Sequence, residues 1–372
     1  MEFALIFCIF TPMKRLSILL AVLLVGVQAL AQNRFTADSE EITYIGRVLR
    51  APDGGSVKAD WSGTTAIVAF QGKSLTLNFE EAREDYLNVW VDKEPGVEAD
   101  TVLKLEGRGE VELCSFKKKG NHTVYLQKRT EGETGCITFL SFDTDGSLLQ
   151  ARPWKERVIE IIGDSYTCGY GVEAPDRDSP AIAREENCNK SYSGILGRFF
   201  DADVVRISHS GRGIIRNYND GDPGQTMPVR YLRTFDEEAE PVWEPSYRPN
   251  IVVIYLGTND FSVGKQPGLN AWCTAYKKLL EEIRANYGPS VPILCVASMA
   301  DPLLSDYVKT VAKHSGIPNV HWTAIYADAH NTGSELGAAW HPNYQGMRKV
   351  ASLMAPYIST LTGWDLPQKP LE

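Results

Sequence analysis

Between residues 44 and 142 the chain alternates apolar and polar residues in short runs. Glycine, aspartate and asparagine separate these runs, and no stretch of helical periodicity lies between them. Strands at this spacing are typical of a β-sandwich or jelly roll. The predicted strands are 65–70, 74–79, 86–91, 102–105, 122–126 and 136–140. We therefore expect an N-terminal β-sandwich domain that spans residues 32–150.

After residue 157 the pattern changes to apolar runs rich in β-branched residues, which alternate with helix-like segments. This alternation is typical of a parallel sheet wrapped by helices. The expected strands are 158–162, 203–208, 251–256, 293–297 and 320–324, and the expected amphipathic helices are 269–287 and 344–361. The fold class is therefore α/β, with an N-terminal β-sandwich (jelly roll) followed by a parallel-sheet domain at residues 155–363. Residues 364–372 are expected to form a C-terminal tail.

The first 31 residues have the organisation of a secretory signal peptide. A basic start at Met13, Lys14 and Arg15 precedes an apolar run at 16–27 and a small-x-small cleavage site. We expect translation to start at Met13 and the mature chain to be secreted, periplasmic or attached to the cell surface. No cysteine follows the apolar run, so a lipoprotein anchor is not indicated. An uncleaved anchor is the alternative, but this run is short for a membrane span, and no membrane insertion is expected after cleavage.

Composition narrows the classes of partner. Lys+Arg 38 and Asp+Glu 47 give a net charge of -9, so the chain lacks the basic surface that attracts nucleic acids and anionic membranes. Apart from Cys8, the cysteines could form three disulfides in an oxidising compartment, or they could be free thiols buried in a large core. The spacing of these cysteines matches no zinc-binding pattern. They are Cys114, Cys136, Cys168, Cys188, Cys273 and Cys295.

Four loops at strand ends carry residues that suit ester hydrolysis. Such loops meet at the carboxyl edge of an open parallel sheet. Ser165 follows the first strand in a Gly-Asp-Ser turn, Gly211 lies in a glycine-rich loop after the second, and Asn259 lies in a Gly-Thr-Asn-Asp sequence after the third. His341 precedes a proline and the last helix. Each sequence also fits an ordinary turn, cap or structural histidine, but their order along one α/β unit favours catalysis.

This ordered set resembles the SGNH or GDSL hydrolase family, whose four namesake residues correspond to Ser165, Gly211, Asn259 and His341. Residues 163–171, 210–217 and 122–131 are in addition similar to carbohydrate esterase family 2, the acetyl-xylan esterase-like enzymes with a jelly roll before the hydrolase. The resemblance implies a flavodoxin-like α/β/α hydrolase domain. It also implies removal of O-acetyl groups, including 6-O-acetyl groups, from plant polysaccharides such as xylan or glucomannan, without a metal or cofactor.

The resemblance assigns a role to each residue. Ser165 attacks the acetyl carbonyl after His341 takes its proton, and an acyl-enzyme forms. The backbone N–H groups of Ser165 and Gly211 and the side-chain amide of Asn259 hold the oxyanion. Trp340, next to His341, is a candidate platform for sugar stacking. The alternative is that Trp340 packs beneath the final helix.

One position departs from the common family pattern. Many SGNH hydrolases carry an aspartate three residues before the histidine, whereas this chain has Ala338. Some members of family 2 instead use a Ser-His dyad whose histidine is oriented by main-chain carbonyl groups. We therefore expect a carbonyl of residues 337–340 to orient His341. Glu335 and, farther away, Asp328 are the alternative partners.

Two other functions fit the same fold, namely an SGNH lipase or phospholipase and a non-catalytic carbohydrate-binding protein. A lipase should have apolar segments near the strand ends, but residues 176–190 and 217–228 are polar, and the second of these segments is rich in glycine and proline. A protein that has lost catalysis should lack the nucleophile or the base, and both Ser165 and His341 are present. The sequence therefore favours a secreted carbohydrate acetylesterase. It does not indicate an oligomeric state.

Overall fold

The computed structural model describes residues 32–262, 264–298, 301–325 and 333–372. The predicted signal peptide, with its start at Met13, lies outside these ranges, as does Asp328. No helix of the described residues is long and apolar enough to cross a membrane. The six cysteines from Cys114 to Cys295 are free thiols. The disulfide alternative is therefore wrong for this structure, and the core is large enough to fold without such links.

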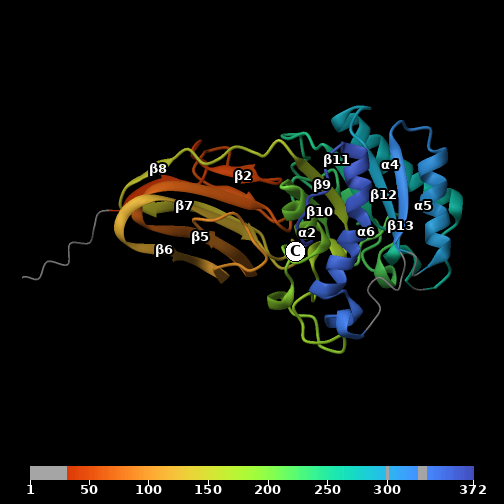
Figure 1. Cartoon of the computed structure of the whole chain (residues 1–372), viewed down its shortest axis with the longest axis horizontal. Coiled ribbons are helices and arrows are strands. Elements are labelled where there is room, and N and C mark those ends of the chain that lie inside the picture. Colours follow the sequence, from red (N-terminus) through yellow and green to blue (C-terminus); the bar gives the residue numbers. More distant parts are fainter. Residues whose placement is uncertain (1–31, 263, 299–300, 326–332) are drawn as a thin grey trace, which may run out of the picture. The chain divides into compact units, whose positions relative to one another are not determined.

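The N-terminal part forms a curled antiparallel sheet (Figure 1). Alternate apolar residues along its strands, such as Val68, Phe70 and Leu77, point into a common core. The β-rich N-terminal domain predicted from the alternation is therefore confirmed. The strands are β1 (Asn33–Thr36), β2 (Thr43–Ile45), β3 (Leu49–Arg50), β4 (Val57–Ala59), β5 (Thr65–Val91), β6 (Thr101–Lys128), β7 (Ile137–Thr144) and β8 (Ser147–Leu149).

Two of these strands are much longer than the pattern predicts. β5 runs through three of the predicted strands, and β6 runs through two. The register between β5 and β6 shifts at several points, including between Gly72 and Ser74 and between Glu81 and Glu84. Such bulges bend and twist a strand without ending its pairing. Residues that are typical of turns therefore lie inside continuous strands.

The C-terminal part contains a parallel sheet in the order β10-β9-β11-β12-β13. This order is that of flavodoxin-like folds, in which the topological switch point lies between the first and third strands, here β9 and β11. The predicted fold class is confirmed, and each strand begins at the predicted residue. The strands are β9 (Val158–Gly163), β10 (Asp203–Ser208), β11 (Ile251–Tyr255), β12 (Ile293–Ser298) and β13 (Val320–Ile325).

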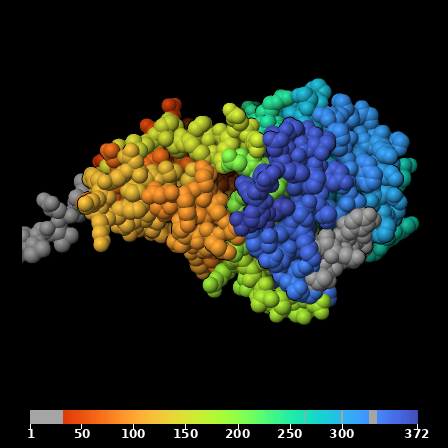
Figure 2. Space-filling view, viewed as in Figure 1, coloured from red at the N-terminus to blue at the C-terminus, as the bar shows by residue number. Residues whose placement is uncertain are grey.

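Helices cover both faces of this sheet (Figure 1). α4 (Leu269–Tyr287) and α5 (Pro302–His314) contribute to the core on one face, and α2 (Tyr192–Phe200) and α6 (Tyr344–Thr362) contribute to the core on the other. Figure 2 shows the outer side of α6 at the surface. Two shorter helices, α1 (Ser165–Cys168) and α3 (Met227–Arg230), follow strand ends.

Side chains from loops of the N-terminal domain are buried against the α/β domain. Trp61 joins the apolar core of that domain and donates from Nε1 to the Thr234 carbonyl at 2.8 Å. The buried guanidinium of Arg47 donates to the carbonyls of Tyr231 and Arg233 at 2.5 and 2.7 Å. Its central carbon lies 3.7 Å from the centre of the Trp243 ring. Residues 32–372 thus form one compact unit.

Candidate active site

Ser165 is the first residue of α1 and lies directly beyond the carboxyl end of β9. Asp164 caps this helix by accepting a hydrogen bond from the Tyr166 N–H. A Cβ atom at Gly163 would come within 1.9 Å of Thr167 Oγ1, so this tight turn requires glycine. Ser165 is 8% exposed. The turn therefore presents its hydroxyl group to a pocket while it buries most of the residue.

His341 lies beside this hydroxyl group. Its Nε2 atom is 2.8 Å from Ser165 Oγ, and its Nδ1 atom is 3.0 Å from the main-chain oxygen of Ala339. Ala339 and Trp340 have φ values of 50° and 62°, a region that non-glycine residues seldom adopt. This left-handed turn brings the Ala339 carbonyl back to the imidazole ring. Ala339 lies within residues 337–340, the segment whose carbonyl groups were expected to orient His341.

The other expected partners of His341 are placed differently. Ala338 is fully buried, and its N–H donates to the Gly171 carbonyl at 3.1 Å. The Glu335 carboxylate forms an ion pair with Lys349 on α6. The contact on Nδ1 therefore comes from the main chain, whereas the described carboxylate nearest in sequence pairs with a lysine.

Asn259 lies beyond β11 in a 3₁₀ turn (Thr258–Phe261). Its Nδ2 atom is 3.2 Å from the Asp164 carboxylate and 3.0 Å from the Arg212 carbonyl. The amide therefore links the serine turn to the loop of Gly211, which has a φ of 75°. Burial raises the pKa of Asp164 to about 7. The structure thus brings the strand-end groups together, although it also gives the Asn259 amide two acceptors within the chain.

The loop of Gly211 is held from one side by Asp260, a residue whose role the sequence did not reveal. Its carboxylate accepts hydrogen bonds from the main-chain N–H groups of Ile214, Ile215 and Arg216 at 2.8, 2.8 and 3.0 Å. Asp260 is fully buried, and burial raises its pKa. A Cβ atom at Gly213 would lie 2.4 Å from this carboxylate, which explains the second glycine of the loop.

The same loop is held from the other side by Glu131, which follows β6 of the N-terminal domain. Its Oε2 atom accepts a hydrogen bond from the Ser210 N–H at 2.6 Å. The neighbouring Lys128 is fully buried, lies 2.6 Å from Asp85 and donates to the carbonyl of Glu131 at 3.0 Å. From the sequence, Glu131 was noted only as part of residues 122–131, which resemble the family, and no role was assigned to it. The structure shows that it connects the N-terminal domain to the loop of Gly211.

Ser165, Asn259 and His341 line one pocket of about 370 Å³. Trp340 also lines it and is 59% exposed, so the alternative that it packs beneath the final helix is wrong. Its left-handed backbone turns the ring outward, and the Arg177 guanidinium lies 4.2 Å from the ring centre. Tyr218 is a further exposed aromatic residue at the pocket.

Within the described ranges, three groups of side chains have the spacing of metal ligands. Glu131 belongs to two of them, and it already accepts the Ser210 N–H. His209 belongs to two as well, and its ring pairs with Asp236 at 2.6 Å while Arg230 lies 3.2 Å away. A nearby guanidinium opposes a cation, so the donor set fits a hydrogen-bonded network better than a metal site. The groups are Glu131, Cys168 and Glu186; Glu131, Glu133 and His209; and His209, Asp236 and Glu237.

Two family models match the chain. Residues 44–153 match Carbohydrate esterase 2 N-terminal, and residues 161–349 match the GDSL-like Lipase/Acylhydrolase family. A solved family two carbohydrate esterase from Clostridium thermocellum, in complex with cellohexaose, is 32% identical to this chain. The match has a TM-score of 0.79 and covers 87% of this chain and 100% of that one. The chain belongs to the family 2 carbohydrate esterases.

Two curated relatives agree with this assignment. Cellulase/esterase CelE of Acetivibrio thermocellus is 33% identical over 340 residues, which are 88% of this chain and 40% of CelE. An acetylxylan esterase / glucomannan deacetylase of Cellvibrio japonicus is 28% identical over 364 residues, which are 91% of this chain and 98% of that protein. The esterase is therefore a carbohydrate acetylesterase with a GDSL-type hydrolase domain.

Proposed function

We propose that the esterase removes O-acetyl groups from plant polysaccharides of the xylan or glucomannan type, with Ser165 as nucleophile and His341 as general base. The observation that carries this proposal is the 2.8 Å contact between His341 Nε2 and Ser165 Oγ. A histidine in hydrogen-bond reach of a strand-end serine is the arrangement that activates a hydroxyl group for acyl transfer. The name of the Cellvibrio relative supports the substrate class.

In the first half of the reaction, Ser165 Oγ forms a bond to the acetyl carbonyl carbon while His341 Nε2 takes the hydroxyl proton. The carbonyl oxygen becomes an oxyanion, which the backbone N–H groups of Ser165 and Gly211 and the amide of Asn259 would stabilise. The tetrahedral intermediate then collapses. The bond between the acetyl carbon and the sugar oxygen breaks, and His341 returns its proton to that oxygen.

In the second half, a water molecule gives a proton to His341 and attacks the acetyl-serine. The bond between the acetyl carbon and Ser165 Oγ breaks, His341 returns the proton to Oγ, and the released acetic acid ionises to acetate. The Ala339 carbonyl, 3.0 Å from Nδ1, accepts the Nδ1 hydrogen throughout. This fixes the tautomer in which Nε2 is free to accept a proton.

The pocket suits a short acyl group on a sugar. Trp340 and Tyr218 offer aromatic surface against which a sugar ring can pack, and Asp301 and Ser262 add polar groups to the lining. The long acyl chain of a lipase substrate would need an extended apolar channel, whereas this pocket of about 370 Å³ combines apolar residues such as Phe261 and Leu304 with those polar groups.

Acetate release from acetylated xylan, acetylated glucomannan and an aryl acetate tests the proposal, with an aryl octanoate as the long-chain control. We expect release from at least one polysaccharide and at least tenfold lower turnover of the octanoate. Faster turnover of the octanoate would support the lipase alternative. Binding of the polysaccharide without acetate release would support the non-catalytic one.

We further propose that the esterase is exported by the segment at residues 1–31 and acts outside the cytoplasm. Its basic start, apolar run and small-x-small site support this proposal. N-terminal sequencing of the protein from its native host should give Gln32 as the first residue. Full-length protein that still begins at Met13 would contradict cleavage.

A further inference from the structure

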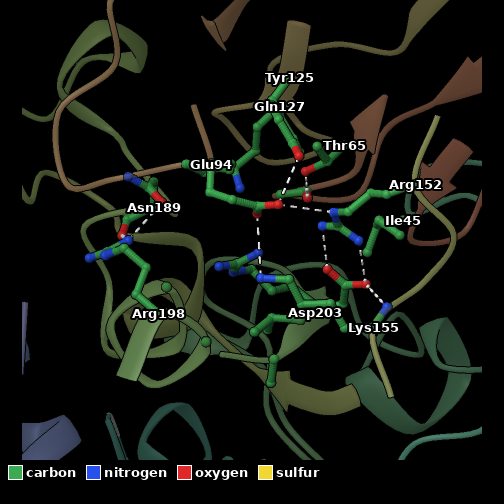
Figure 3. Close-up of a pocket in the computed structure, with 17 residues that line it drawn as sticks. Ile45, Thr65, Glu94, Tyr125, Gln127, Arg152, Lys155, Asn189, Arg198 and Asp203 are labelled. Carbon is green, nitrogen blue, oxygen red and sulfur yellow. Dashed lines mark hydrogen bonds and ion pairs between the residues drawn. The ribbon is translucent and has the colours of Figure 1, made fainter. Parts of the chain in front are cut away.

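A second cavity, of about 80 Å³, lies away from the catalytic serine between the two sheets (Figure 3). Its walls come from the start of β5 and the end of β6, from the segment that links the domains, and from α2 and β10. Basic side chains outnumber acidic ones among the lining residues. The charged members are Glu94, Arg152, Lys155, Arg198, Asp203 and Arg206.

The two acidic groups of this cavity already have partners. Arg152 pairs with both Glu94 and Asp203, at 3.2 and 2.9 Å. Glu94 also accepts a hydrogen bond from the Tyr125 hydroxyl at 2.8 Å and lies 3.4 Å from Lys155. Figure 3 shows these groups joined along one side of the cavity. Their negative charge is therefore balanced locally by Arg152 and Lys155.

Arg206 differs from Arg152 and Lys155, because no described carboxylate forms an ion pair with it. It is 3% exposed, and its Nε donates to Ser193 Oγ at 2.6 Å. Gly63 packs directly on the guanidinium, since a Cβ atom there would lie 2.0 Å from Nη1. Burial lowers the pKa of Arg206, and the groups that act against this effect are Cys188, Cys168 and a tyrosine.

Those three groups do not neutralise Arg206. Burial raises the pKa of Cys188, Cys168 and Tyr192 above their ordinary values, so all three are uncharged at neutral pH. An arginine remains protonated even when it is buried. A buried charge without a counter-charge destabilises the folded state. The fold therefore leaves a positive charge that a bound anion could balance.

Arg198 adds to the positive potential. Its Nη1 donates to the main-chain and side-chain oxygens of Asn189, both at 2.8 Å, which are neutral acceptors, and its Nε donates to the main-chain oxygen of Glu372 at 2.8 Å. Burial lowers the pKa of Arg198, and the positive charge of Arg206 lowers it as well, so the two guanidinium groups repel each other. An anion between them would relieve this repulsion.

We propose that this cavity binds a small monovalent anion, a halide or a short carboxylate such as acetate, held by Arg206 and Arg198. The anion balances the buried guanidinium of Arg206 and links the N-terminal sheet to α2 and β10. Because the walls come from both domains, bound anion stabilises their packing. Acetate is also the product of the enzyme, so the binding of a halide and the binding of acetate are tested separately.

The direct test is diffraction from crystals of the wild-type esterase grown in sodium bromide. We expect an anomalous peak within hydrogen-bond distance of the Arg206 guanidinium. A cavity that holds only water under these conditions would overturn the proposal. This arm needs no variant, so it does not depend on whether a mutant folds.

The second arm measures the thermal midpoint at constant ionic strength while chloride or acetate replaces gluconate, which is too bulky for the cavity. Wild type should gain about 2–5 °C. Arg206→Met should lose this gain, and Ser193→Ala, which frees the guanidinium, should reduce it. Arg157→Met is the control, because Arg157 contacts Trp364 outside the cavity, and it should respond like wild type. Equal midpoints in all three salts, or an unchanged gain in Arg206→Met, would contradict the proposal.

Discussion

The loop of Gly211 and the segment of His341 approach the same serine, but the chain holds them by different means. Buried carboxylates from two distant parts of the sequence, Glu131 and Asp260, accept the main-chain N–H groups of the first. The segment of His341 is fixed mainly by main-chain bonds, such as Gly337 N–H to the His341 carbonyl at 2.8 Å and Ala338 N–H to the Gly171 carbonyl at 3.1 Å. Ala339 and Trp340 within it are exposed.

This difference corresponds to two tasks. Donors for an oxyanion must stay fixed while charge develops, and buried charged acceptors give such rigidity. In the proposed mechanism the histidine exchanges protons with substrate and water, which suits its place nearer the surface, and the Ala339 carbonyl fixes its tautomer. We therefore expect the loss of a carboxylate to lower kcat more at the loop of Gly211 than at the segment of His341.

The largest effect should come from the reacting pair itself. Ser165→Ala and His341→Ala should each lower kcat for an aryl acetate by at least about 10⁴-fold, because each removes the acyl-enzyme route. Steady-state kinetics and a thermal melt would check this. The midpoint should stay within a few degrees of wild type. Turnover of Ser165→Ala within tenfold of wild type would remove Ser165 as the nucleophile.

Asn259→Ala should have the next largest effect. We expect kcat to fall by about 10²–10³-fold with a smaller change in KM, because an oxyanion donor acts mainly in the transition state. The variant also loses the contacts to Asp164 and Arg212, so a melt must show that it is folded. A change confined to KM would instead assign Asn259 to ground-state binding.

Glu131→Ala tests whether a carboxylate positions the loop of Gly211. Without its acceptor for the Ser210 N–H, the loop of Gly211 should lose its position, and kcat should fall by about tenfold with KM little changed. Glu131→Gln keeps an acceptor oxygen and should restore most of the activity.

The matched control for this prediction is Glu112→Ala, an exposed glutamate on β6 of the same domain, which should behave like wild type. If Glu131→Ala and Glu112→Ala had equal kcat values, the N-terminal domain would not position the loop.

The smallest effect is expected at Glu335 on the histidine side. Glu335→Gln removes the charge that pairs with Lys349, but it leaves the Ala339 carbonyl on His341. We expect kcat within about fivefold of wild type, which is roughly 1 kcal/mol in the transition state. Asp328→Asn should behave in the same way. A loss of about 10³-fold in either variant would reveal a hidden triad acid.

The candidate residues that the structure brings together could be predicted from the sequence, because each follows a strand of the parallel sheet. Apolar runs set the strand ends, and the sheet order brings the loops together. Glu131 was harder to predict, since it lies 79 residues before Ser210 and meets it only where the two domains pack. Local patterns do not carry such contacts. The long strands β5 and β6 were missed for a related reason, because bulges continue the pairing where glycine and acidic residues suggest turns.

We propose that Ser165 and His341 form the reacting pair, with the main chain in place of a triad acid. Labelling with a fluorophosphonate ester and peptide mapping by mass spectrometry tests this pair most directly. We expect one label per chain, on Ser165, at a rate that His341→Ala lowers by at least about 10³-fold and Glu335→Gln leaves within about fivefold. Label on another residue, or fast labelling of His341→Ala, would contradict it.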